Sequence, residues 1–252
     1  MVPYWRNTAR LPSAFMRATE RVCALTNAGK HIPGETRMTT LHSSLGPNPR
    51  LVRMFMIEKG LEEGRDFARV HYDIITGQNR QDAGYMAKNP QGTTPTLELD
   101  DGTCLTESWP ICEYIEELHP APNLFGETPV ERATVRKWAR LFDQEVVVPM
   151  TMGFRATTGR PMFEPRMTVV SPEAGAELFA LADEKWRMFD ACLGASNHIA
   201  LGRFTFADLI MFAFANFGFT VGWKLPEGTD NLARFVAAHN QRPCAVIWTM
   251  AE

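Results

Sequence analysis

Hydrophobic and polar positions in the first half of the chain switch repeatedly between strand-like and helix-like spacing. Apolar side chains recur on one face between residues 50 and 59, whereas residues 67–74 alternate and are rich in β-branched types. Asp100-Asp101-Gly102 joins two short extended runs, which predicts an antiparallel hairpin. The predicted elements are strand 39–42, helix 50–59, strand 67–74, helix or turn 80–88, strands 94–99 and 103–105, and helix 107–118. This βαβαββα order predicts an α+β, thioredoxin-like domain at 38–120.

The second half shows helical periodicity and no convincing strand. A segment rich in proline at 121–129 has the composition of a linker. Beyond it, one long helix is predicted at 131–152, bent at Pro149, and another at 172–193. Thr205 and Asp208 have the spacing of a capping box, which predicts the start of a further helix. We therefore expect an all-helical domain, a bundle, at 130–252.

Residues 1–37 differ in composition from the rest of the chain. They carry five arginines and one lysine against two glutamates and have no apolar run. We expect a disordered leader, with Met38 as the functional start. An organelle-targeting segment, which would also be rich in arginine and poor in acids, is the alternative.

Charge and cysteine content narrow the classes of partner. A net charge of −3 gives no reason to expect nucleic acid or an anionic membrane. The most apolar stretch, 209–219, is shorter than the roughly 20 residues that span a bilayer. Five scattered cysteines form no CxxC or zinc-type cluster, so neither a disulfide framework nor a metal is expected. Free thiols favour a reducing, cytoplasmic location.

Four segments, in order and at these spacings, resemble the cytosolic glutathione transferases over residues 39–250. They are 43–61, which includes Gly46-Pro47-Asn48-Pro49; 88–97, which includes Thr94-Pro95; 100–114, which includes Glu107-Ser108; and the capping box at 205–208. Among these enzymes the chain is most similar to the bacterial and fungal group related to the second yeast glutathione transferase. The resemblance implies a thioredoxin-like domain that binds glutathione and a helical domain that binds an electrophilic substrate.

The resemblance also assigns roles in glutathione binding. Glu107 and Ser108, at the start of a helix, would hold the γ-glutamyl end, because helix N-terminal amides bind carboxylates. Thr94, before a cis peptide to Pro95, would pair with the cysteinyl unit like an added strand. Arg80 would bind the glycine carboxylate, although a solvated surface charge is an equal alternative.

Thiolate formation is where the sequence departs from the family. The position that usually carries a serine or cysteine falls on Gly46. Either Ser43 or Ser44 reaches the sulfur, or the helix N-terminus near Asn48 stabilises the thiolate with help from the helical domain. We favour the second route, in which Thr151 and Arg155 take the places of a hydroxyl and a histidine; arginine would act through charge and not as a base.

The electrophile is expected between the domains. Met and aromatic side chains form adaptable apolar walls, and the candidates are Met152, Phe154, Met162, Phe163 and Trp223. The predicted function is conjugation of glutathione to small hydrophobic electrophiles by a homodimer. A glutathione-dependent thiol or peroxide reductase and a non-catalytic binding module are the alternatives.

Overall fold

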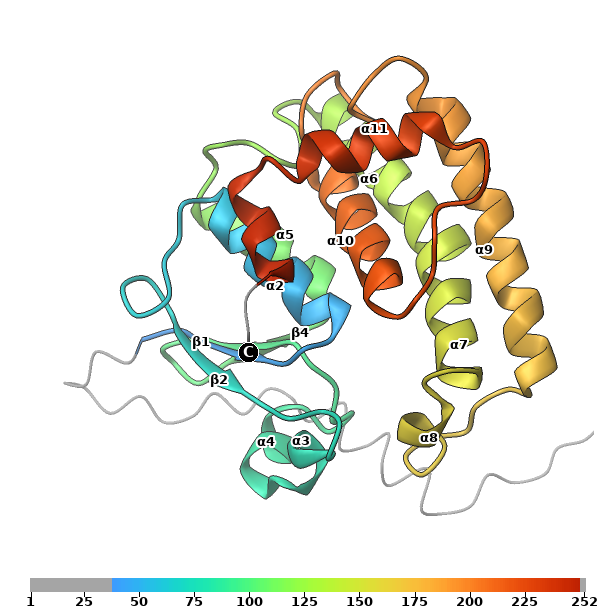
Figure 1. The fold of residues 1–252 in the computed structure, drawn as a ribbon. Helices are drawn as coiled ribbons and strands as arrows, with labels where there is room; N and C mark the ends of the chain where they lie inside the picture. Colours follow the sequence, from blue (N-terminus) through green and yellow to red (C-terminus); the bar gives the residue numbers. More distant parts are fainter. Residues whose placement is uncertain (1–37, 250–252) are drawn as a thin grey trace, which may run out of the picture.

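A four-stranded mixed sheet forms the base of the first structural unit in this computed structural model, which describes residues 38–249 (Figure 1). The strands are β1 (Thr40–Ser43), β2 (Ala68–His71), β3 (Thr96–Glu98) and β4 (Cys104–Thr106), in the order β2-β1-β3-β4. β1 pairs parallel with β2 and antiparallel with β3, and β3 pairs antiparallel with β4. The predicted leader lies outside the described residues.

Helices cover both faces of this sheet. α2 (Pro47–Glu58) and α5 (Ser108–Leu118) pack side by side on one face, and the short α3 (Gln78–Gln81) and α4 (Ala83–Lys88) lie on the other (Figure 1). The thioredoxin-like βαβαββα prediction is thereby confirmed, with the predicted helix at 80–88 divided in two at Asp82. The Asp82 carboxylate accepts a hydrogen bond from the Tyr85 amide and so begins α4.

The rest of the described chain is helical, as predicted. Its elements are α6 (Pro129–Phe142), a π-helical segment (Asp143–Val147), α7 (Val148–Ala156), α8 (Arg160–Phe163), α9 (Pro172–Leu193), α10 (Phe206–Thr220), α11 (Asp230–His239) and a 3₁₀ segment (Pro243–Trp248). α10 packs against both α6 and α2 and is buried around nearly its whole circumference, which explains its almost uniformly apolar sequence. No helix of the described chain is both long and apolar enough to cross a membrane.

The long helix predicted at 131–152 differs in one respect. It is interrupted by a π turn at Asp143–Val147, just before Pro149, where the Val148 amide donates to the Asp143 carbonyl. Proline lacks an N–H and its ring would clash with the carbonyl four residues before, that of Glu145. The π turn moves the chain out of this clash, and such turns are frequent at functional sites.

The capping box predicted at the start of α10 is present. The Asp208 carboxylate accepts from the Thr205 amide at 2.8 Å and from the Thr205 hydroxyl at 2.9 Å. It also accepts from the Ile199 amide at 2.7 Å, so it fixes the preceding loop as well as the helix. Burial raises the pKa of Asp208 to about 7, against the effect of these three donors.

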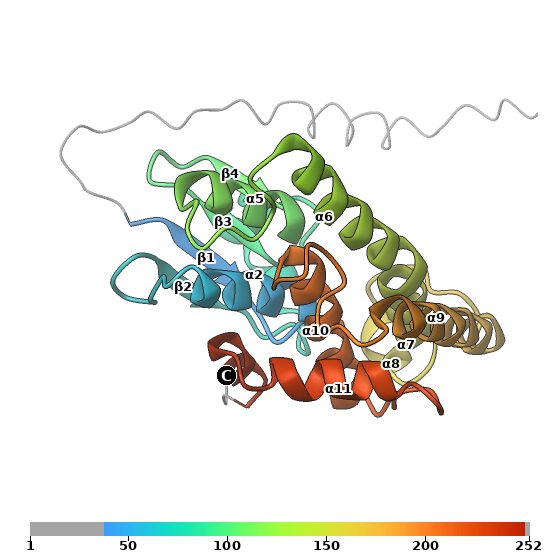
Figure 2. The same cartoon turned by 90° about the horizontal axis from the view of Figure 1, so that it is seen from above.

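Two sets of contacts fasten the helical unit to the sheet unit. The chain after α11 returns over α2, where the buried Glu58 carboxylate accepts from Arg242 Nη2 at 2.5 Å (Figure 2). On the other side of the molecule, the Arg166 guanidinium donates to the carbonyls of Ile74 and Ile75. These contacts fix the two walls of the cleft that lies between the units.

Candidate functional site

The interdomain cleft has a volume of about 350 Å³ and is bounded by both units. The N-termini of α2 and α5 form one wall; the π segment, α7 and the start of α10 form the other. Its lining residues are Asn48, Leu51, Glu107, Ser108, Trp109, Asp143, Val147, Val148, Thr151, Met152, Arg155, Phe206 and Ile210. Two helix N-termini with polar side chains therefore face a mostly apolar helical wall that carries one cation.

The first turn of α2 presents very few hydrogen-bond donors to the cleft. Gly46 is the N-cap, and Pro47 and Pro49 have no N–H. The Arg50 amide already donates to the Gly46 carbonyl. Asn48 is thus the residue of this turn whose amide has no partner among the described residues, and its side chain lies in the same cleft. The expected set of α2 amides is reduced to this single group.

The backbone conformation at position 46 does not require a glycine. Its φ is −61° and its ψ is 157°, which any residue adopts. A Cβ at this position would meet ordinary van der Waals neighbours, the nearest being Pro49 Cδ at 3.4 Å and Ser44 Oγ at 3.6 Å. Space for a side chain therefore exists at the position where the resemblance places a hydroxyl or thiol.

The start of α5 combines an unusual backbone conformation with a free helix end. Glu107 has a φ of +68°, a left-handed value that is rare for residues other than glycine and that is found at binding sites. The Ser108 hydroxyl donates to Asn48 Oδ1 at 3.2 Å and so connects the two helix N-termini. Pro110 supplies no amide, so the amides of Ser108 and Trp109 are the donors left for a ligand carboxylate.

The loop before β3 lies outside the lining of the cleft but next to α2. The Thr94-Pro95 bond is cis, as the resemblance implied. The Thr94 amide and carbonyl make no backbone hydrogen bond within residues 38–249. The Thr94 hydroxyl is 2.7 Å from the Ser44 hydroxyl, which is fully buried. Ser44 is not among the residues that line the cleft, and its hydroxyl connects the Thr94 loop to the end of β1.

Arg80 is exposed on α3, beside the same loop. The neighbouring Asn79 donates to the Gly92 carbonyl at 2.7 Å, and the aliphatic part of Arg80 lies against Gly92. The Arg80 guanidinium makes no hydrogen bond or ion pair with the part of the chain that the structure describes. Its position is compatible with either predicted role, ligand or surface charge.

The helical wall carries the two residues expected to assist the thiolate. The Thr151 hydroxyl donates to the Val147 carbonyl at 2.7 Å, which leaves its oxygen as an acceptor towards the cleft. The Arg155 guanidinium lies 5.4 Å from the centre of the Phe163 ring and has no carboxylate partner among the described residues. Burial lowers the pKa of Arg155; arginine side chains are not deprotonated in proteins, so the guanidinium carries its charge. The cleft thus contains an unpaired, half-buried cation.

Of the expected electrophile contacts, Met152 lines the cleft and the others do not. Phe154 packs edge-on against Phe163 and Phe217, inside the helical unit. The ring centroid of Trp223 lies 5.2 Å from that of Trp186, and Trp223 Nε1 donates a hydrogen bond to Asp183 at 2.8 Å. The structure therefore gives Phe154 and Trp223 a place in the packing behind the wall; Met162 is also absent from the cleft lining.

Asp143 is a cleft residue that sequence reasoning missed. It lies at the first position of the π segment, and its carboxylate accepts from Arg140 at 2.8 Å. Burial raises the pKa of Asp143, although Arg140 opposes the shift. The apolar pattern at residues 131–152 predicts only a long helix. A regular α-helix would not predict that Asp143 faces the cleft. A proline preceded by an acid six residues earlier is the available signal, and it is a weak one.

Comparison with known proteins agrees with a sheet unit followed by a helical unit. A family model for the glutathione S-transferase N-terminal domain matches residues 41–123, and one for the C-terminal domain matches residues 157–243. Glutathione S-transferase 2 of Saccharomyces cerevisiae is 29% identical over 208 residues, covering 82% of this chain and 87% of that protein. Glutathione S-transferase GstA of Escherichia coli is 29% identical over 183 residues, covering 72% of this chain and 85% of that protein.

A solved structure agrees with the fold over the same region. The crystal structure of Gtt2 from Saccharomyces cerevisiae matches with a TM-score of 0.75 at 29% identity, covering 83% of this chain and 99% of that chain. The two domain matches occur in the expected order and span the sheet unit and the helical unit in turn. The chain therefore belongs to the glutathione S-transferase family and is related to yeast Gtt2.

Proposed function

We propose that the protein binds glutathione in the interdomain cleft and transfers its thiolate to a small electrophile. The observation that carries this proposal is the convergence of two helix N-termini, at Asn48 and at Ser108, with the unpaired cation of Arg155 in one cleft. Glutathione has two carboxylates and a thiol that becomes an anion. A cleft with amide donors at one end and a guanidinium at the other is complementary to those charges.

Glutathione is proposed to lie across the edge of the sheet unit. Its γ-glutamyl carboxylate accepts from the Ser108 amide and from the Ser108 hydroxyl, which turns away from Asn48 Oδ1 to donate to it, and the exposed Glu107 carboxylate receives its ammonium. Its cysteinyl peptide unit pairs with the amide and carbonyl of Thr94, which make no backbone hydrogen bond within residues 38–249. Arg80 receives the glycine carboxylate.

The thiolate is proposed to be stabilised by charge and hydrogen bonds, without a general base. A free thiol has a pKa of about 8.5, so it must be lowered for attack near neutral pH. The Asn48 amide points from the positive end of α2, and Arg155 adds a full positive charge from the opposite wall. Thr151 lines the same cleft, and its hydroxyl can donate to the sulfur by turning away from the Val147 carbonyl.

The electrophile is proposed to occupy the apolar part of the cleft, against Met152, Val148 and Ile210. The carbon–sulfur bond forms as the thiolate attacks the electrophilic carbon, and the leaving group departs with the electron pair. A thiol or peroxide reductase that uses its own cysteine is less consistent with the site, because none of Cys104, Cys112, Cys192 and Cys244 lines the cleft.

The proposal is tested by two assays on the same variants. Calorimetric titration with glutathione measures binding, and absorbance at saturating chlorodinitrobenzene measures conjugation. Ser108→Ala is expected to weaken glutathione binding by about 10-fold or more, since a hydrogen bond to a charged group contributes about 1.5–3 kcal/mol. Ser171→Ala is the matched control, because Ser171 caps α9 and is not among the residues that line the cleft.

The two assays separate the functions. Glutathione binding that depends on Ser108, together with conjugation, supports a transferase. Binding without conjugation of any of several electrophile classes would leave only a binding module. Undetectable binding at millimolar glutathione contradicts both readings.

A further inference from the structure

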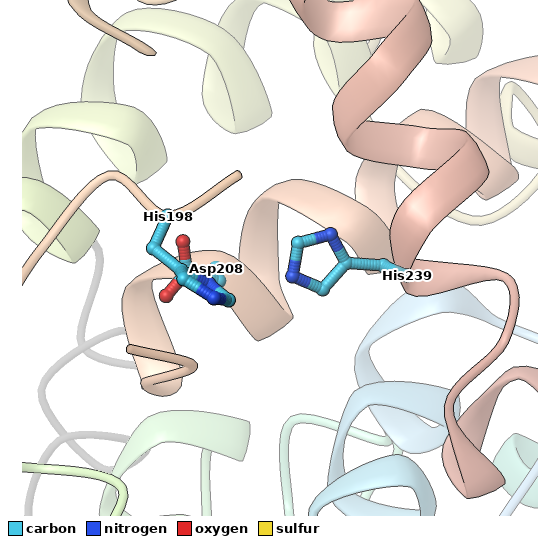
Figure 3. A group of neighbouring side chains, drawn as sticks. All are labelled: His198, Asp208 and His239. Atoms are coloured by element: carbon cyan, nitrogen blue, oxygen red, sulfur yellow. The ribbon is translucent and has the colours of Figure 1, made fainter. Parts of the chain in front are cut away.

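Three side chains from different segments of the helical unit meet at a place outside the cleft lining. They are His198 in the loop before α10, Asp208 in the first turn of α10, and His239 at the end of α11 (Figure 3). One nitrogen or oxygen from each residue lies within 4.8 Å of those of the other two. The spacings of ten and thirty-one residues along the chain match no zinc motif, so no sequence pattern predicts this group.

The His239 imidazole is held as a metal-ligating histidine is held. It is 2% exposed, and its Nδ1 is 2.7 Å from the Phe235 carbonyl, which makes Nδ1 the protonated nitrogen. Nε2 is then the lone-pair nitrogen, and it has no hydrogen-bond partner among the described residues. Figure 3 shows this ring directed towards His198 and Asp208. A backbone carbonyl that fixes the tautomer is the usual outer-shell partner of a histidine ligand.

The other two side chains are also suited to the role. Asp208 is oriented by the amides of Ile199 and Thr205 and by the Thr205 hydroxyl, and its Oδ1 accepts only the Ile199 amide, so a lone pair remains. The Nδ1 atom of His198 is buried and has no hydrogen-bond partner among the described residues.

The surrounding charges do not exclude a cation. Arg242 is the nearest positive group, and the Glu58 carboxylate neutralises it at 2.5 Å. The C-terminal end of α11, where His239 lies, favours a positive charge. The N-terminus of α10 disfavours a positive charge, but the Asp208 carboxylate of the capping box offsets the partial positive charge of this helix end.

We propose that His198, Asp208 and His239 form a binding site for a divalent transition-metal ion, with zinc as the best fit. Two neutral imidazoles and one carboxylate suit Zn²⁺, which takes nitrogen at about 2.0–2.1 Å in a tetrahedral arrangement with water as the fourth ligand. The ligand atoms must close by about 1–1.5 Å from their present spacing to reach that geometry. His198 can supply the movement, because its side chain is partly exposed on a loop.

The bound ion would tie the end of α11 to the loop before α10 and to the start of α10, two segments that the Ile199–Asp208 hydrogen bond already joins. Because a ligand that binds only the folded state stabilises it, Zn²⁺ is expected to raise the melting temperature of the protein. The site lies outside the interdomain cleft, so this inference stands independently of the proposed transferase activity.

Calorimetric titration of chelator-treated protein with Zn²⁺ tests the inference. Wild type is expected to bind one ion at this site, and His198→Ala to weaken that binding at least about 10-fold, as loss of even an outer-shell partner does. His119→Ala is the matched control, since His119 is an exposed histidine outside the group. His239→Gln, which keeps an amide near the Phe235 carbonyl, provides a second variant at a buried ligand.

Titration with Co²⁺ identifies the ligands. Visible bands of low-coordinate cobalt without a thiolate charge-transfer band are expected, and they should be lost in His198→Ala. Charge-transfer absorption from thiolate would assign the ion to cysteines and overturn the inference. Equal Zn²⁺ affinity in His198→Ala, His119→Ala and wild type, or no stoichiometric binding to wild type, would overturn it as well.

Discussion

Replacing Gly46 with serine places a hydroxyl at the N-cap of α2, beside the Asn48 amide. The backbone there already has the extended conformation of an N-cap residue, with φ −61° and ψ 157°, and the nearest neighbour of a Cβ would be 3.4 Å away. Gly46→Ala serves as the matched control, since it adds the Cβ without the hydroxyl. Both variants are expected to fold, and to be more stable by about 0.4–1 kcal/mol because the unfolded chain loses freedom.

The effect on the thiol follows from the strength of one hydrogen bond. The serine hydroxyl can accept from the Asn48 amide and donate to the sulfur. A hydrogen bond to a charged group contributes about 1.5–3 kcal/mol, and one pKa unit corresponds to 1.36 kcal/mol. Gly46→Ser should therefore lower the pKa of bound glutathione by about one to two units relative to Gly46→Ala.

The assay is the pH profile of kcat/KM for conjugation, recorded for wild type and both variants. The acidic limb of the profile should move to lower pH in Gly46→Ser and stay unchanged in Gly46→Ala. Identical profiles for serine and alanine would show that the sulfur does not lie at the N-terminus of α2. A loss of activity beyond about 100-fold in Gly46→Ala would mean that the ligand backbone needs the space of glycine, which corresponds to about 2.7 kcal/mol of transition-state stabilisation.

Four further outcomes are expected. Arg155→Leu should reduce kcat/KM by about 10- to 100-fold, with a smaller loss in Arg155→Lys, in steady-state kinetics. Ser44→Ala should lower kcat/KM by less than about 10-fold, mainly through a higher KM for glutathione, because the Ser44 hydroxyl holds the Thr94 hydroxyl at 2.7 Å. A loss of kcat/KM above about 100-fold would make Ser44 the thiolate ligand. Gly218→Ala should destabilise by about 1–3 kcal/mol in urea unfolding, since its Cβ would lie 2.5 Å from Trp223; equal stability would contradict the packing. The pKa of His239 is about 4 in the folded protein against an ordinary 6.5, so its contribution to stability is complete above pH 6.5 and is lost as the pH falls towards 4. With chelator present, the free energy of unfolding of wild type should fall by roughly 3 kcal/mol relative to His239→Gln over that range. Parallel curves of unfolding free energy against pH would refute this.

Local signals in the sequence were sufficient for most of the fold. The Asp100-Asp101-Gly102 turn, the helix at 172–193 and the Thr205–Asp208 capping box are each decided by residues close together in the chain, and the structure has all three. Two of the strand pairings follow as well, because a βαβ unit is parallel and a hairpin is antiparallel; the pairing of β1 with β3 joins residues far apart in the chain and has no local signal.

The site was predicted only in part, because packing decides which face of an element reaches the cleft. Glu107, Ser108, Asn48, Thr151 and Arg155 line the same cleft, although the resemblance and not the local pattern singled them out. Trp223 looked like a pocket residue because aromatic side chains serve walls and cores equally.

Two features depend on geometry that the sequence does not encode locally. The π turn sets Asp143 towards the cleft, but helical periodicity cannot distinguish a π turn from a continuous helix. The group of His198, Asp208 and His239 forms only when α11 packs on α10 and α9, so no motif along the chain announces it.

The thiol pKa of glutathione in the complex tests the central claim most directly, measured from thiolate absorbance against pH in wild type and Arg155→Ala. A pKa well below the free thiol value of about 8.5 in wild type, raised in Arg155→Ala, is the predicted result. Glutathione that binds with an unshifted pKa in both proteins would contradict electrostatic activation in this cleft.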